Sequence, residues 1–181
     1  MNTQLIILQG GEDVAKRTNE ILFKNVANLS VTKKILVIPW TSNTMEMEYR
    51  TIFNNYFTHS GFQGVLFLET DDSNSEITRK ITSVDVIYLP GGDPDILYRE
   101  IKKRSLQNRL HDFKGILIGN SAGAIVLSKG SVDLHGGKFF SGFGLAKFFI
   151  TVHFNLLTIV TDTGSLVHLH SAKSSSFLPS E

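Results

Sequence analysis

The chain carries the stretch GILIGNSAGAIVL at residues 115–127, in which a β-branched apolar run meets a helix-forming run at a Gly-x-Ser-x-Gly pentapeptide. This stretch predicts a buried parallel strand, a sharp bend at Ser121, and a helix that Gly119 and Gly123 allow to pack close to the strand. The bend would hold the Ser121 hydroxyl at the carboxyl end of a sheet, where a serine nucleophile is exposed. The same residues also fit a tight turn in which Ser121 only caps the helix.

Short apolar runs alternate with segments of helical period along most of the chain. Strands are expected at residues 5–8, 35–39, 64–68, 84–89, 115–118 and 148–152, and helices at 12–27, 45–58, around 77–81, at 94–101 and after 121. This alternation predicts an α/β fold in three layers, with an open, mostly parallel sheet and helices on both of its faces. A chain of 181 residues is expected to form a single domain over 1–181.

The regular alternation of strands and helices ends after the helix that follows Ser121. Residues 136–145 are rich in glycine and phenylalanine and predict an irregular loop, strands are expected at 156–160 and 165–169, and residues 171–181 resemble a frayed tail.

The composition limits the classes of partner. The 18 Lys and Arg residues nearly balance the 17 Asp and Glu residues, and no basic run is longer than residues 102–104, so no nucleic-acid surface is indicated. The absence of cysteine excludes disulfides and thiol catalysis. No segment approaches the ~20 apolar residues of a membrane span, and the N-terminus lacks the features of a signal peptide. We expect a cytoplasmic protein, monomeric or homodimeric, with no nucleic-acid or membrane partner.

A second glycine-rich turn, Pro90-Gly91-Gly92-Asp93-Pro94, follows the strand expected at 84–89. Ligand sites in open α/β sheets lie at the carboxyl ends of the strands. Two adjacent glycines let a backbone N–H approach a ligand, and Asp93 can cap the following helix. The segment therefore indicates either a ligand-binding loop or a well-formed turn with no ligand role.

A serine nucleophile needs a base and an acceptor that orients the base. Among six histidines, His153 is the best candidate for the base because it directly follows the expected strand at 148–152, and His135 is a rival in the loop after the serine helix. Asp133 is the only acid between Ser121 and His153, so it is the candidate for the orienting group, although an exposed loop aspartate fits equally well.

The remaining histidines are weaker candidates for a functional role. His59 and His111 lie on expected helices, where a solvated side chain is the ordinary role, and His168 and His170 alternate on an expected strand with no evident third metal ligand. We expect no metal site and no cofactor.

Three motifs in this order carry a resemblance to a known family: Gly-Gly-Asp-Pro at 91–94, Gly-Asn-Ser-Ala-Gly-Ala at 119–124, and GFGLAKFFITVHFN at 142–155. Together the motifs resemble the peptidase E (aspartyl dipeptidase) and cyanophycinase family of serine peptidases, over residues 5–155. The resemblance implies a fold like that of class I glutamine amidotransferases, which is flavodoxin-like, with serine where the amidotransferases have cysteine.

The resemblance also implies roles for individual residues. Ser121 stands at the position of the family nucleophile and His153 at that of the base, with Asp133 on the loop that carries the acid. Backbone N–H groups of Ala122 and of the Gly91–Gly92 loop would form the oxyanion hole, and the neighbouring Asp93 and Asn120 are candidates for binding substrate. The implied activity is that of a serine exopeptidase, a dipeptidase that hydrolyses small peptides, with N-terminal aspartate favoured in peptidase E itself.

Other functions stay open at this stage. Residues 156–181 do not resemble the region that follows the histidine in the family, so an atypical or truncated C-terminal region is expected. This raises the alternative of an inactive family member that binds a small ligand or partner in the same crevice. Glutamine hydrolysis of the amidotransferase kind is disfavoured because cysteine is absent.

Overall fold

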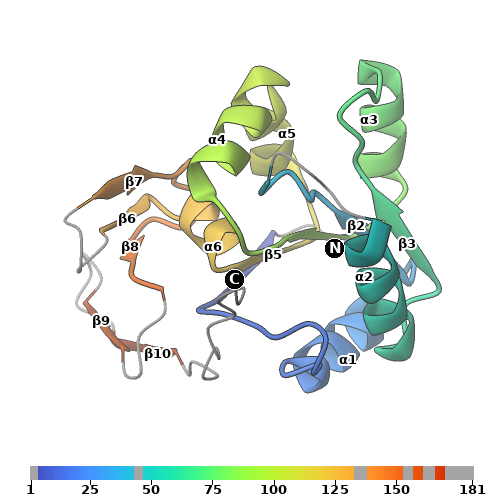
Figure 1. Cartoon of the computed structure of the whole chain (residues 1–181), viewed down its shortest axis with the longest axis horizontal. Helices are drawn as coiled ribbons and strands as arrows, with labels where there is room; N and C mark the ends of the chain where they lie inside the picture. Colours follow the sequence, from blue (N-terminus) through green and yellow to red (C-terminus); the bar gives the residue numbers. More distant parts are fainter. Residues whose placement is uncertain (1–3, 43–46, 133–137, 153–156, 161–165, 170–181) are drawn as a thin grey trace, which may run out of the picture.

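A computed structural model of the chain describes residues 4–42, 47–132, 138–152, 157–160 and 166–169. Its centre is a parallel sheet of five strands in the order β1-β5-β4-β2-β3 (Figure 1). The strands are β1 (Leu5–Gln9), β2 (Lys34–Val37), β3 (Gly64–Phe67), β4 (Val86–Leu89) and β5 (Ile116–Asn120). The expected parallel sheet is therefore confirmed.

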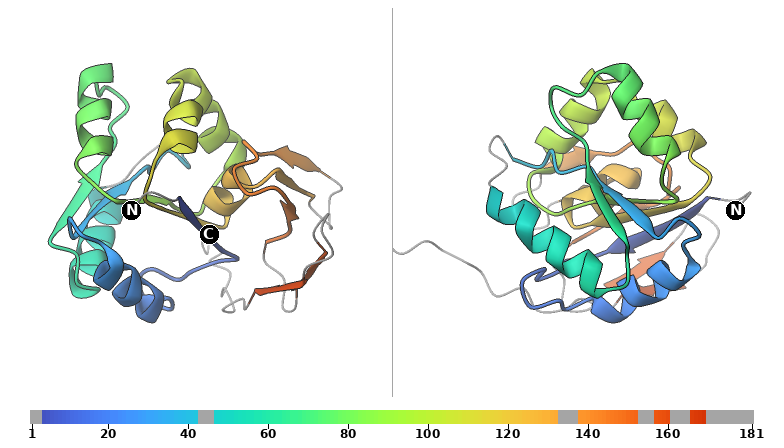
Figure 2. Two further views of the ribbon diagram at one scale, coloured as in Figure 1. Left: turned by 180° about the vertical axis from the view of Figure 1, so that it is seen from behind. Right: turned by 90° about the vertical axis from the view of Figure 1, so that its right-hand side faces the viewer.

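Helices cover both faces of this sheet, as the alternating pattern predicted. They are α1 (Glu20–Leu29), α2 (Met47–His59), α3 (Asn74–Thr82), α4 (Pro94–Lys103), α5 (Leu106–Asp112) and α6 (Ala122–Leu127). The first two, α1 and α2, pack on one face, and the other four lie on the opposite face (Figures 1 and 2). Within the described residues, no helix is long and apolar enough to cross a membrane.

Side chains along β4 alternate between the two hydrophobic clusters on the two faces of the sheet. Val86 and Tyr88 join the cluster under α1 and α2, while Ile87 and Leu89 join the cluster under α3 to α6. All four side chains are fully buried. A strand covered on both faces is apolar at every position, which is why the sequence shows a continuous run here.

The carboxyl ends of β1, β4 and β5 lie side by side. In the register of the sheet, Gly119 pairs with both Leu8 and Leu89, and Asn120 pairs with Gln9. The loops that follow these three strands therefore emerge at one edge, where ligands bind in folds of this class.

The loop after β1 corrects a sequence-based expectation. A helix was predicted over 12–27, but α1 begins only at Glu20. The Asp13 carboxylate accepts a hydrogen bond from the Lys16 N–H, and Arg17 has a left-handed φ of 54°, which ends this single turn before a helix can continue. Residues 10–19 therefore form a loop with turns between β1 and α1.

The chain beyond α6 also holds more regular structure than expected. A small sheet in the order β7-β6-β8 contains β6 (Gly130–Val132), β7 (Phe139–Ser141) and β8 (Phe149–Ile150). The expectation of an irregular loop over 136–145 was wrong for β7, whose backbone pairs antiparallel with β6. The two last expected strands are confirmed as the antiparallel pair of β9 (Leu157–Val160) and β10 (Leu166–Leu169). The tail at 171–181 lies outside the described residues.

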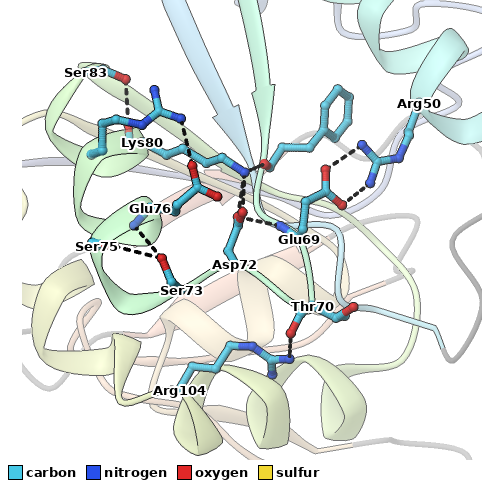
Figure 3. Close-up of polar contacts among 12 residues, drawn as sticks. Arg50, Glu69, Thr70, Asp72, Ser73, Ser75, Glu76, Lys80, Ser83 and Arg104 are labelled. Carbon is cyan, nitrogen blue, oxygen red and sulfur yellow. Dashed lines mark hydrogen bonds and ion pairs between the residues drawn. The ribbon is translucent and has the colours of Figure 1, made fainter.

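Polar contacts fasten the loop after β3 to its neighbours (Figure 3). Lys80 of α3 donates hydrogen bonds to Asp72, at 2.6 and 2.7 Å, and to the Phe67 carbonyl at 2.9 Å. Arg50 of α2 makes a two-pronged ion pair with Glu69. These bonds fix the carboxyl end of β3 between two helices.

Candidate active site

Ser121 sits on a strained bend between β5 and α6. Its φ of 47° and ψ of −104° are rare for a residue other than glycine. Two backbone hydrogen bonds hold the bend: the Ser121 N–H donates to the Gln9 carbonyl at 2.9 Å, and the Ser121 carbonyl accepts from Ile125 N–H at 3.0 Å. The Ser121 side chain does not cap α6, so the alternative of a capping serine is wrong.

The bend requires glycine at position 123, because α6 lies against the end of β4. A Cβ atom at Gly123 would lie 2.1 Å from the Leu89 carbonyl oxygen. The Gly123 N–H donates to the Pro90 carbonyl at 3.1 Å, which ties α6 to the loop after β4. The predicted role of Gly123 in close packing of strand and helix is confirmed.

The loop that follows β4 lies directly beside the serine. A Cβ atom built on Gly91 would be 3.4 Å from the Ser121 Cβ. Gly92 has a φ of 132°, and a Cβ there would approach the Thr41 side chain to 2.6 Å, so only glycine fits. The structure thus brings together the two glycine-rich turns that the sequence singled out.

A pocket of about 500 Å³ opens in front of these turns. Its walls come from the loop after β1, from α2, and from the ends of β4 and β5; the lining residues are Gly11, Glu12, Asp13, Val14, Ala15, Tyr49, Ile52, Phe53, Tyr88, Pro90, Gly91, Gly92, Asn120 and Ser121. The volume is in the usual range for small-molecule sites.

Glu12 is the most unusual group in this pocket. Its carboxylate accepts hydrogen bonds from the Tyr56 hydroxyl at Oε1 and from the Tyr88 hydroxyl at Oε2, the second at 3.1 Å. Burial raises the pKa of Glu12 to about 7, against the two tyrosine hydrogen bonds, which act to lower it. A pocket-lining carboxylate whose pKa is raised by burial is a candidate for a functional group.

Aromatic packing fixes the two tyrosines that hold Glu12. The Tyr88 ring makes edge contacts with Phe23, Phe53 and Phe57 at centroid distances of 5.3 to 5.7 Å. Tyr56 contacts the Phe23 ring in the same way at 5.2 Å. Both tyrosine side chains are therefore held rigidly, and with them the orientation of the carboxylate.

Asn120 joins Glu12 to the serine through Tyr88. Asn120 is 4% exposed, and its side chain hydrogen-bonds Tyr88. Its Oδ1 atom is buried and has no hydrogen-bond partner among the described residues. A buried acceptor without a donor costs free energy unless a ligand supplies one.

The structure settles the positions of only some of the predicted site residues. It gathers Gly91, Gly92, Asn120 and Ser121 around one pocket, and Ala122 opens α6, so its N–H has no intrahelical acceptor. Asp93 lies outside the pocket lining and caps α4, where its Oδ1 accepts from the N–H groups of residues 95 and 96 at 2.8 and 3.1 Å. His153 and Asp133 lie outside the described residues.

Sequence reasoning missed Glu12 and Tyr88. Glu12 was assigned to the start of a helix. It follows a strand and two glycines, Gly10 and Gly11, and Asp93 likewise follows a strand, Pro90 and two glycines. That repeated pattern at the carboxyl end of a strand was the available signal. Tyr88 gave none, since a tyrosine within a buried strand is ordinary core.

Serine hydrolases built on parallel sheets carry their nucleophile on this kind of bend, and the fold and the site place the chain in that class. A model of Peptidase family S51 matches residues 5–175, and the chain therefore belongs to this family of serine peptidases. It is a peptidase by family, as the resemblance implied.

Two solved structures show the same fold. A peptidase from an acI-B1 Actinobacterium is 23% identical, with a TM-score of 0.65 over 83% of this chain and 68% of the other. A putative peptidase E protein from Listeria monocytogenes EGD-e is 17% identical, with a TM-score of 0.65 over 93% of this chain and 99% of the other. The expected class I glutamine amidotransferase-like, flavodoxin-like fold is thereby confirmed. No curated protein sequence matches the chain.

Among the residues that the structure describes, no group of three or more His, Cys, Asp or Glu side chains is arranged to hold a metal ion.

Proposed function

We propose that the chain is a serine exopeptidase, similar to dipeptidase E, that hydrolyses short peptides through an acyl-enzyme. The observation that supports this most directly is the strained bend at Ser121, which opens into a pocket of about 500 Å³ beside the Gly91–Gly92 loop. A pocket of this size admits one or a few amino-acid residues rather than a folded protein.

The mechanism follows from the groups around the serine. His153 takes the proton from Ser121 Oγ as this oxygen attacks the scissile carbonyl carbon, and the N–H groups of Ala122 and of the Gly91–Gly92 loop stabilise the resulting oxyanion. The C–N bond then breaks, and His153 gives its proton to the leaving amine. Water, deprotonated by His153, hydrolyses the ester and restores Ser121.

Asp133 is the proposed acid that orients His153. The strands leading to the two residues support this pairing: β6 ends at Val132, β8 ends at Ile150, and the two strands are parallel neighbours. The chain therefore leaves both strands in the same direction, one toward Asp133 and the other toward His153.

An N-terminal aspartate is the finer part of the proposal and rests on the resemblance to peptidase E. No basic side chain lines the described part of the pocket to pair with an aspartyl carboxylate. Comparing the rates of hydrolysis of Asp-Ala and Asn-Ala, which have nearly the same shape, tests this preference directly.

The first prediction concerns the nucleophile itself. Replacing Ser121→Ala removes the attacking oxygen, so kcat for a short-peptide substrate should fall at least about 10³-fold, as it does when a catalytic serine is lost. The measurement is release of free amine from a dipeptide library, with Ser75→Ala on α3 as a control serine far from the pocket. Circular dichroism and unfolding curves establish that both variants are folded.

Equal trace activity in the wild type and Ser121→Ala would overturn the proposal. Reaction with a fluorophosphonate separates the two functions that the sequence left open. A covalent adduct at Ser121 in folded wild type supports the peptidase, whereas complete lack of labelling favours a binding protein that uses the same pocket.

A further inference from the structure

We propose that the pocket beside Ser121 contains a subsite for the free ammonium group of a substrate, formed by the Glu12 carboxylate together with Asn120 Oδ1. The chain would then act on peptides with an unblocked amino terminus and reject N-acylated ones. This inference rests on the proposed peptidase function and deepens it by naming two substrate-binding residues and the group that they bind.

Glu12 keeps unused hydrogen-bond acceptor positions. Each of its oxygens accepts one tyrosine hydroxyl, and each retains a second acceptor position. The two tyrosines are uncharged, so they orient the carboxylate without neutralising it. A cationic donor in the pocket would complete the site.

Asn120 carries a second unfilled acceptor. Asn120 is one of the residues that line the pocket, and its Oδ1 atom is buried and has no donor within the described part of the chain. The Asn120 side chain is itself bonded to Tyr88, which fixes its orientation. An ammonium group carries three donor hydrogens and can satisfy Asn120 and Glu12 together.

The pocket is acidic over its described lining. Its described lining contains Glu12 and Asp13 but no Lys, Arg or His. Asp13 is bound to Lys16 by an ion pair of 2.9 Å and is already compensated, and the groups that face Glu12 from α2 and β4 are the uncharged Tyr56 and Tyr88. Glu12 is thus the carboxylate left for an incoming cation.

The position of the acceptors fits a substrate that is bound at the nucleophile. In an exopeptidase that releases the N-terminal residue, the α-ammonium nitrogen is only two bonds from the carbonyl carbon under attack. Its acceptors must therefore lie next to the nucleophile. Asn120 directly precedes Ser121, and Tyr88 links Asn120 to Glu12.

Binding can be measured without turnover in the Ser121→Ala variant. The probes are Ala-Ala-amide and its N-acetyl derivative, titrated by calorimetry at pH 7.5, which lies above the pKa of about 7 of Glu12, so that most of the carboxylate is charged. We expect the free amine to bind about 10- to 100-fold more tightly, as for a charge-assisted hydrogen bond. Adding Glu12→Gln should abolish most of this difference, whereas Glu76→Gln on α3, a matched exposed glutamate, should leave it unchanged.

Turnover gives the second measurement. In an enzyme with Ser121 intact, Glu12→Gln should raise the KM for an unblocked peptide about tenfold or more relative to wild type. It should change kcat less, because the lost contact is present in both the ground state and the transition state. Asn120→Asp, which replaces the side-chain amide by a carboxylate and keeps an acceptor oxygen there, should retain the preference for a free amine.

The outcomes distinguish the two proposals. Hydrolysis with equal kcat/KM for free and acetylated peptides overturns the ammonium subsite and leaves the peptidase standing. Preferential binding of the free amine with no hydrolysis of any peptide supports the subsite and overturns the peptidase. Equal binding of both probes to folded Ser121→Ala overturns the subsite whatever the activity.

Discussion

At the scale of single residues, the bend at Ser121 could be predicted because local chemistry alone dictates it. A strand, a Gly-x-Ser-x-Gly segment and a helix admit few backbone paths, and the observed φ of 47° at Ser121 is the strained turn that the motif implies. Glu12 could not be found in this way. Its significance depends on Tyr56 and Tyr88, which are 44 and 76 residues away in sequence and meet it only in the folded chain.

The contact between Gly123 and Leu89 gives a prediction at this scale. In Gly123→Ala, the added methyl group would lie 2.1 Å from the Leu89 carbonyl oxygen, so α6 must move away from β4. We expect the free energy of unfolding to fall by about 3 kcal/mol, as for overpacking against a backbone atom that cannot yield. Peptidase activity should fall as well, because the displaced helix begins directly after Ser121.

Gly64→Ala is the matched control for this substitution. A Cβ at Gly64 would meet only the flexible Lys34 side chain, at 3.2 Å, so the stability of that variant should change by less than about 1 kcal/mol. Urea unfolding of the two variants compares them directly. Equal stability of Gly123→Ala and wild type would contradict the close packing described at the bend.

At the scale of elements, the predicted strands and helices were right where periodicity and apolar runs determine the backbone conformation. They were wrong where hydrogen bonds of polar side chains determine it. The segment 12–27 has a helical distribution of apolar residues, yet the Asp13 hydrogen bond and the left-handed Arg17 divert its first part into a loop. β7 was missed because only its pairing with β6, and not its own sequence, makes it a strand. Such partners are not visible in a local pattern.

The ion pair between α3 and the loop after β3 gives a prediction at the scale of elements. The Lys80 side chain is 12% exposed and that of Asp72 is 4% exposed. Burial acts to raise the pKa of Asp72, but hydrogen bonds from Lys80 and from the Glu69 N–H outweigh it and hold this pKa below its ordinary value. Asp72→Asn leaves the buried ammonium without its counter-charge and should lower the free energy of unfolding by about 3 kcal/mol.

Arg79→Gln on the same helix serves as its control. The pair between Arg79 and Glu76 is 3.4 Å long, with side chains that are 65% and 51% exposed. Loss of such a surface pair should cost less than about 1 kcal/mol. If chemical denaturation shows both variants equally destabilised, the special contribution of the buried pair is refuted.

At the scale of the whole molecule, the two hydrophobic clusters stabilise the sheet, whereas the pocket at its edge holds groups that oppose folding. Strand burial and the two-sided helical cover follow from the sequence because apolar area dominates them. Glu12 has the opposite effect: it loses hydration on folding and gains only neutral hydrogen bonds. Keeping a buried carboxylate at the pocket lowers the stability of the fold, and such a cost is common at functional sites.

This cost predicts how stability depends on pH. Folding raises the pKa of Glu12 from 4.5 to about 7, so the native state holds this proton more tightly than the unfolded state does. The contribution to stability is fully present below pH 4.5 and is lost as the pH rises through 7. Glu12→Gln has no proton to lose. Its stability relative to wild type should therefore increase by about 2–3 kcal/mol between pH 5 and pH 8.

Urea unfolding of wild type and Glu12→Gln at both pH values measures this change, and all other titrating groups cancel in the difference between the two proteins. Glu76→Gln, which removes an exposed carboxylate, should show a difference that is nearly independent of pH. A flat difference for Glu12→Gln as well would mean that the carboxylate is hydrated in the folded protein. A desolvated carboxylate at the pocket would then no longer be available to attract an ammonium group, so this stability measurement bears on substrate binding without any substrate present.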